Sequence, residues 1–208
     1  MGGGEAHGPS RGAMERPPGP ADCATRAPAC SPAVGRLAPR GVLVPLTREE
    51  VAQAAFIGTQ RNLAALMDAR SPAYGAGRAG AWQRHIVGAG GELALARYAN
   101  RFWSGTVGTV AAPHDVYRWQ VRATEYAEGR LTVHRGDPDE RPFVLVTGIM
   151  PQLCLVGWVL GRAGKRPEWW TNPARSGPAR WAFYVPHAAL EPLETLPGLR
   201  GPALRVAP

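Results

Sequence analysis

Glu92 is the first residue whose type and spacing suggest chemistry. In the run from Gly88 to Asn100, small and apolar residues recur with Glu92 at helical spacing, so its carboxylate lies on the face that should meet a sheet. A carboxylate directed at a core costs free energy unless it is paired, hydrogen-bonded or bound to a cation. We therefore expect Glu92 to have a partner.

A second group of polar residues lies at and after the start of a predicted strand, Asp115 to Thr124. Apolar and polar side chains alternate along this run, which is the period of a half-buried strand. The polar side chains of one alternate set can face a site. In that set, Gln120 offers a neutral carbonyl oxygen to a hard cation, and Arg122 can grip a phosphate group through two hydrogen bonds.

An acidic residue on a helix, an Asp at the edge of a strand and a polar-x-basic triplet on the strand together resemble the PD-(D/E)xK nuclease superfamily of restriction-endonuclease-like folds. In that family the helix acid, the motif Asp and the triplet acid hold one or two Mg²⁺ ions, and the triplet lysine lies beside the attacking water. The resemblance implies that Glu92 and Asp115 are catalytic acids, that Gln120 takes the triplet acid position and that Arg122 takes the lysine position. It further implies a Mg²⁺ or Mn²⁺ ion held by Glu92, Asp115, Gln120 and the Val121 carbonyl oxygen.

Two of these positions differ from the family's pattern. Gln120 brings no charge, which should weaken Mg²⁺ binding. Arg122 keeps its positive charge, but its pKa is too high for proton exchange. Each residue also has an ordinary structural interpretation. Glu92 can be satisfied by a hydrogen bond in the core, Asp115 can be a turn residue, and Gln120 and Arg122 can lie on a solvated strand face.

Two helices are predicted before this strand. Thr47 and Glu50 have the spacing of a capping box, which predicts a helix over residues 47–69 with apolar residues at helical spacing. Arg61 on this helix is interpreted as a solvated surface residue, with a phosphate contact as the alternative. The second helix, over residues 82–101, carries Glu92.

The glycines in front of Glu92 invite comparison with a dinucleotide-binding fingerprint. That fingerprint requires a third glycine where this chain has Leu93. The glycines therefore indicate close packing of the helix start on a neighbouring element, or backbone amides that approach an anion.

The second half of the chain contains predicted strands and one basic, aromatic segment. Residues 162–180 predict a loop in which Lys165 and Arg166 precede Trp169 and Trp170. Basic groups interleaved with exposed aromatic rings can grip a phosphate backbone and stack on bases, so these four residues and Arg122 are the predicted DNA contacts. Alternatively, both tryptophans fold back onto the domain. Further strands are predicted at 130–134, 143–147, 153–160 and 181–185, and a helix at 188–195.

The composition favours a nucleic-acid partner only weakly. The chain has 24 basic and 16 acidic residues, a formal charge of +8 and a pI of about 10.2. A net positive charge is expected of a protein that binds polyanions such as nucleic acids. However, every basic residue except Lys165 is an arginine. Arginine used in this way, with abundant Ala, Gly and Pro, also fits nucleotide bias in the coding DNA.

Composition further predicts the domain boundaries and the compartment. Residues 1–40 are rich in Gly, Pro, Ala and Arg, which predicts a disordered tail before a domain over residues 41–195 and a C-terminal tail over 196–208. No run of 18 or more apolar residues is present, so no membrane partner is expected. The first residues do not have the order of a secretory signal, which predicts a cytoplasmic protein. The sequence is compatible with a monomer or a homodimer.

These patterns predict an α/β single domain with a restriction-endonuclease-like core, in which helices 47–69 and 82–101 flank a mixed central sheet of about five or six strands. The function implied by the resemblance is a metal-dependent nuclease that hydrolyses DNA phosphodiester bonds, with Arg122 stabilising the developing charge. A non-catalytic DNA-binding or assembly protein on the same fold is the alternative, favoured by Gln120 and Arg122. A third alternative is a small structural domain whose basic character is compositional.

Overall fold

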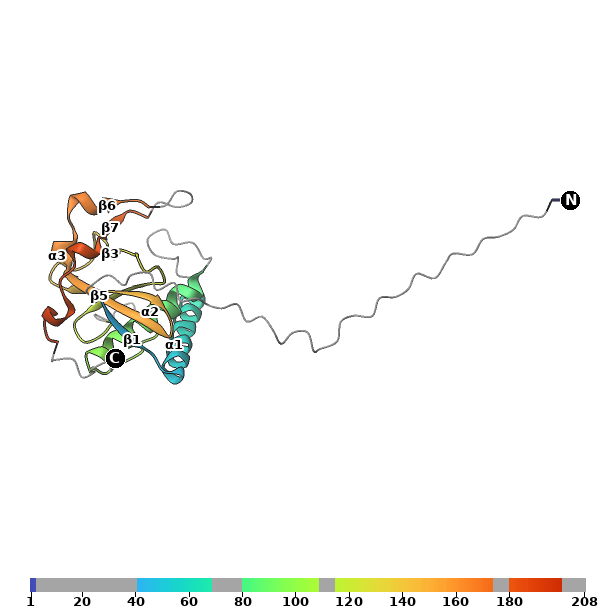
Figure 1. Ribbon diagram of the computed structural model, residues 1–208, viewed down its shortest axis with the longest axis horizontal. Helices are drawn as coiled ribbons and strands as arrows, with labels where there is room; N and C mark the ends of the chain where they lie inside the picture. Colours follow the sequence, from blue (N-terminus) through green and yellow to red (C-terminus); the bar gives the residue numbers. More distant parts are fainter. Residues whose placement is uncertain (3–40, 69–79, 109–114, 174–179, 200–208) are drawn as a thin grey trace. The chain divides into compact units, whose positions relative to one another are not determined.

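The computed structural model describes residues 1–2, 41–68, 80–108, 115–173 and 180–199 (Figure 1). The predicted N-terminal tail falls almost entirely outside these residues. Part of the predicted C-terminal tail lies inside them, and Leu196 is buried at 2% exposure. The ordered domain therefore continues past residue 195.

A four-stranded mixed sheet lies at the centre of the domain. Strand order is β1-β5-β4-β2, where β5 pairs antiparallel with β1 and β4, while β2 pairs parallel with β4. The predicted α/β class and mixed central sheet are confirmed. The strands are β1 (Val42–Pro45), β2 (Gln120–Thr124), β4 (Pro142–Ile149) and β5 (Gln152–Leu160).

A second sheet accounts for the remaining strands, so the prediction of one sheet of five or six strands is wrong. Its order is β3-β7-β6, with antiparallel pairs throughout. The segment predicted as a loop over residues 162–180 contributes β6, and a short helix precedes it. The elements are β3 (Leu131–Val133), α3 (Gly161–Gly164), β6 (Trp170–Thr171) and β7 (Ala182–Val185).

Two long helices, α1 (Arg48–Met67) and α2 (Ala81–Tyr98), pack against each other, and α2 packs against the central sheet. The capping box predicted for α1 is present, because the Thr47 hydroxyl accepts a bond from the Glu50 amide and the Glu50 carboxylate accepts one from the Thr47 amide. Glycines allow the close approach of α2. A Cβ atom on Gly91 would lie 2.7 Å from the Ala123 Cβ atom of β2.

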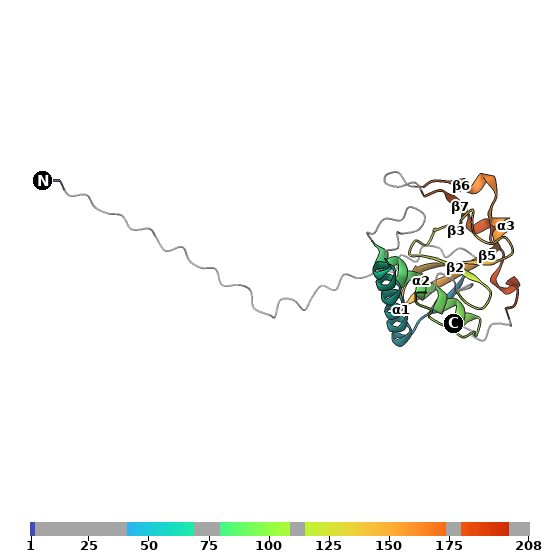
Figure 2. The ribbon, with the colours of Figure 1, turned by 180° about the vertical axis from the view of Figure 1, so that it is seen from behind.

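The two faces of the central sheet bury different partners. Val121 of β2 and Val144 of β4 belong to the core beneath α2, whereas Phe143 and Leu145 belong to the core shared with the second sheet. Figures 1 and 2 show α1 and α2 on one side of the central sheet and β3, β6 and β7 on the other. Alternate residues of β2 consequently face two different environments.

The helix predicted over residues 188–195 is replaced by two short 3₁₀ turns, His187–Ala189 and Leu193–Thr195. The prolines at positions 186 and 192 stand directly before these turns, and proline disfavours a helical conformation in the residue before it. In the part of the chain that the structure describes, no helix is long and apolar enough to cross a membrane.

The α1–α2 contact generates the first prediction. A Cβ atom on Gly58 of α1 would lie 2.5 Å from the Ile86 Cα atom of α2, so that the helices must separate in a Gly58→Ala variant. We expect a lower melting temperature. In the matched control Gly88→Ala, the added methyl group meets nothing within 4 Å, and the helix gains about 0.5–1 kcal/mol of stability. Equal melting temperatures for the two variants would contradict the close packing of α1 on α2.

Candidate functional site

Glu92 is buried, at 6% exposure, and three donors bind its carboxylate. The Arg61 guanidinium donates from Nη1 to Oε1 at 2.6 Å and from Nη2 to Oε2 at 2.8 Å. The Trp103 indole Nε1 donates to Oε2 at 2.9 Å. The expectation that Glu92 has a partner is therefore confirmed. Both carboxylate oxygens are occupied by side chains of the protein itself.

Arg61 belongs to this buried site, so its interpretation as a solvated surface residue is wrong. Its Nε donates to the Thr106 carbonyl oxygen at 2.9 Å while its two terminal nitrogens bind Glu92. Burial opposes the charged form of Arg61, but its hydrogen bonds to Glu92 and the charge of that carboxylate outweigh burial and raise the pKa of Arg61. The geometry is a bidentate, charge-assisted pair that joins α1 to α2.

Asp115 fixes a tight turn. Its Oδ2 atom accepts a hydrogen bond from the Val121 amide at 2.7 Å, and its own amide donates to the Trp119 carbonyl oxygen at 3.1 Å. Val116 and Trp119 face each other across the turn. The carboxylate thus holds the start of β2 against the chain that precedes it, as the structural interpretation of Asp115 expects.

Burial and three charged neighbours act on the pKa of Asp115. Burial raises the pKa of Asp115, and the negative charge of Glu92 raises it further. The Val121 amide hydrogen bond and the charges of Arg122 and Arg61 act in the opposite direction. The structure therefore brings the two predicted acids into one electrostatic environment, with a guanidinium already bound to Glu92.

Arg122 points to the face of the central sheet that carries the second sheet. Its Nη2 donates to Asp137 Oδ2 at 3.0 Å and its Nε donates to the Thr132 carbonyl oxygen at 3.2 Å. Its Nη1 lies 3.4 Å from the Val121 carbonyl oxygen, and the guanidinium lies over the Phe143 ring at 4.9 Å. Arg122 thus ties β2 to the second sheet.

The donor atoms predicted for Mg²⁺ or Mn²⁺ do not fit a divalent cation as they are arranged here. Arg61 and Trp103 engage both oxygens of Glu92, and the carbonyl oxygen of Val121 accepts from Arg122. Asp115 has one oxygen on the Val121 amide. Within the described ranges no group of three or more His, Cys, Asp or Glu side chains could hold a metal ion. The Arg61 guanidinium supplies the positive charge that Glu92 requires.

The predicted DNA contacts of the basic, aromatic segment have partners within the domain, although Arg166 is exposed. Lys165 Nζ donates to Asp139 Oδ1 at 2.6 Å, and Arg166 Nε lies 2.8 Å from Glu168 Oε1. Trp169 and Trp170 are half-buried, and both pack against the core that contains the second sheet. Acidic neighbours thus neutralise both cations, and the tryptophans fold back onto the domain.

The excess of basic over acidic residues in the full chain does not come from this domain. In the described ranges acidic and basic residues are almost equal in number. Most of the excess arginines lie in the segments 3–40, 69–79, 174–179 and 200–208. Any attraction of the domain itself to phosphate must come from local groups rather than from net charge.

Comparison of the chain with protein-family models, with curated proteins and with solved structures found no match. The resemblance to the PD-(D/E)xK superfamily therefore depends on the residues from Glu92 to Arg122 alone. The restriction-endonuclease-like core stays a prediction.

The second prediction concerns the buried carboxyl group of Asp115. Its pKa in the folded protein lies above the value in the unfolded chain, so the folded state binds the proton more tightly. The free energy of unfolding therefore falls as pH rises from the unfolded pKa through the folded pKa. Asp115→Asn keeps an oxygen for the Val121 amide and removes this titration. We expect its melting temperature to depend less on pH than that of the wild type between about pH 4 and pH 7.

Asp115→Ala is the matched control for the hydrogen bond. It removes both the titration and the acceptor for the Val121 amide, so its melting temperature should lie below that of Asp115→Asn at every pH. Identical pH dependence in the wild type and in Asp115→Asn would contradict the buried environment of this carboxyl group.

Proposed function

We propose that this protein binds DNA without cleaving it, on an α/β domain whose acidic residues serve the fold. The observation that carries this proposal is the bidentate bond of Arg61 to Glu92. In the nuclease mechanism Glu92 must be available to a metal ion. In this domain the guanidinium already satisfies both carboxylate oxygens.

The remaining residues of the motif support binding over catalysis in the same way. Gln120 is neutral, and Arg122 is tied to Asp137. The Asp115 carboxylate accepts a backbone amide at the turn.

Two arginines outside the ion pairs of the described residues support a contact with phosphate. Arg118 is exposed and Arg141 is half-buried, and neither forms an ion pair with a residue that the structure describes. They lie at the start of β2 and of β4, which are neighbouring parallel strands. Guanidinium groups in this state bind phosphate oxygens through paired hydrogen bonds.

The third prediction concerns DNA binding by the full chain. A fluorescently labelled oligonucleotide should show increased anisotropy with the wild-type protein, and the affinity should fall with added salt because binding releases counterions. The affinity should be the same with Mg²⁺ and with EDTA, and the DNA should remain intact on a denaturing gel.

The same experiment tests the nuclease that the resemblance implies. Cleavage that requires Mg²⁺ or Mn²⁺ and disappears in Asp115→Ala would overturn the non-catalytic proposal in favour of a nuclease. Absence of any anisotropy change at low salt would overturn DNA binding itself. Glu49→Gln, an exposed change on α1, is the control variant and should behave as the wild type. Cleavage that is equal in the wild type, Glu49→Gln and Asp115→Ala would indicate a contaminating nuclease.

A further inference from the structure

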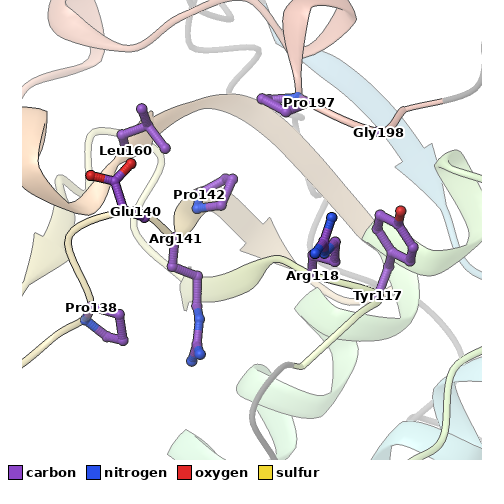
Figure 3. A pocket seen from close by; sticks show the side chains of 9 residues that line it. All are labelled: Tyr117, Arg118, Pro138, Glu140, Arg141, Pro142, Leu160, Pro197 and Gly198. Carbon is purple, nitrogen blue, oxygen red and sulfur yellow. The ribbon is translucent and has the colours of Figure 1, made fainter.

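A cleft of about 510 Å³ opens beside the turn that Asp115 holds (Figure 3). Three segments form its walls, and Leu160 at the end of β5 completes it. One wall is the turn tip with Tyr117 and Arg118, the second is the segment from Pro138 to Pro142, and the third is Pro197 with Gly198. The volume lies within the range of small-molecule sites, which is about 300–1,000 Å³.

The turn tip is a strained and well-anchored wall. Tyr117 has a φ of +54°, a left-handed conformation that costs free energy for a residue with a side chain. The Asp115 carboxylate fixes the base of the turn, and the Arg101 guanidinium lies 4.4 Å from the centre of the Tyr117 ring. Such strain persists only where the surrounding structure enforces it, and it concentrates at functional sites.

The segment from Pro138 to Pro142 is held from behind by α3. The Gly161 amide donates to the Arg141 carbonyl oxygen at 2.9 Å, and the Arg162 amide donates to the Asp139 carbonyl oxygen at 2.9 Å. A Cβ atom on Gly161 would collide with the Pro138 carbonyl oxygen. Only glycine therefore allows this close approach, which sets the position of Arg141.

The third wall is bonded directly to the first. Trp119 Nε1 donates to the Pro197 carbonyl oxygen at 2.9 Å, and Arg101 Nη2 donates to the Gly198 carbonyl oxygen at 3.0 Å. Trp119 is fully buried. The cleft is consequently preformed, since hydrogen bonds fix each wall independently of a ligand.

Charge and apolar surface are separated within the cleft. Arg118 and Arg141 bring two guanidinium groups that form no ion pair with a described residue, and Glu140, which lines the same cleft, is paired with Arg162. Proline rings, Leu160 and the 45%-exposed Tyr117 provide apolar and aromatic surface. A ligand that matches this lining carries a dianionic or monoanionic phosphate beside a flat, weakly polar ring.

We propose that this cleft, the Arg118–Arg141 cleft, binds one nucleotide, with the phosphate attracted by the charges of the two arginines and the base against Tyr117 and the prolines. The inference rests on the proposed DNA-binding function and names the group that the domain recognises. The nucleotide comes from the end of a DNA strand or from a free nucleoside monophosphate. The two sources share the same chemistry, and the experiment separates them.

The test compares three probes in titrations of the full chain: a single-stranded oligodeoxynucleotide with a 5′-phosphate, the same strand with a 5′-hydroxyl, and thymidine monophosphate. We expect the phosphorylated strand to bind most tightly. Arg118→Ala and Arg141→Ala should each weaken its binding about tenfold, because each removes a positive charge from the cleft. Arg118→Lys should recover only part of the affinity. Arg48→Ala, exposed at the start of α1, should bind as the wild type.

The outcomes separate this inference from DNA binding in general. Unchanged affinity in Arg118→Ala and Arg141→Ala, with a wild type that binds DNA, overturns the cleft and leaves the proposed function standing. Binding of thymidine monophosphate that requires Arg118, without binding of either strand, supports the cleft and overturns DNA as its source. The Trp119 indole N–H resonance reports on the wall directly. The wild-type protein is titrated with thymidine monophosphate or with the phosphorylated strand. If the chemical shift of the Trp119 indole N–H does not change, the proposal is overturned, whether or not the variants fold.

Discussion

The buried pair of Arg61 and Glu92 is the interaction on which the rest of this structure depends. Helix α2 is buried from Ala89 to Ala96, so a carboxylate at position 92 has little contact with bulk water. Leaving such a charge without a partner costs several kcal/mol, whereas a bidentate guanidinium with a third donor from Trp103 satisfies it. The pair also joins α1 to α2, and the ion pair of Arg97 with Glu50 joins the same two helices near the start of α1.

The two faces of the central sheet explain why the motif residues do not form one cluster of ligands. Glu92 lies on the helix that covers one face, while Arg122 extends from the opposite face of β2 to Asp137. Asp115 lies at the strand start and serves the turn. Acidic groups are thus used to hold the fold together, whereas Arg118 and Arg141, which form no ion pair with a described residue, lie where β2 and β4 begin.

Sequence reasoning succeeded where a local pattern had a physical cause and failed where distant segments meet. The capping box at Thr47 and the need of Glu92 for a partner follow from spacing and burial within one helix. The identity of that partner does not, because Arg61 is placed by the packing of another helix against α2. Several strands after Arg122 are predicted by the alternation of apolar and polar residues. A strand as short as β6 is too short to show such an alternation, so the sequence does not predict that the strands divide into two sheets. The Arg118–Arg141 cleft combines three separate segments, and no spacing relates them.

The most direct test of this account is the free energy of unfolding of four proteins, measured by urea denaturation with and without Mg²⁺: the wild type, Arg61→Ala, Glu92→Gln and the double variant. We predict that Arg61→Ala loses about 3–5 kcal/mol, because it leaves a buried charge without its main partner. The double variant should recover part of this loss, and Mg²⁺ should leave the wild type unchanged. A wild type stabilised by Mg²⁺, together with an Arg61→Ala variant of undiminished stability, would show that a metal ion and not the guanidinium belongs at Glu92.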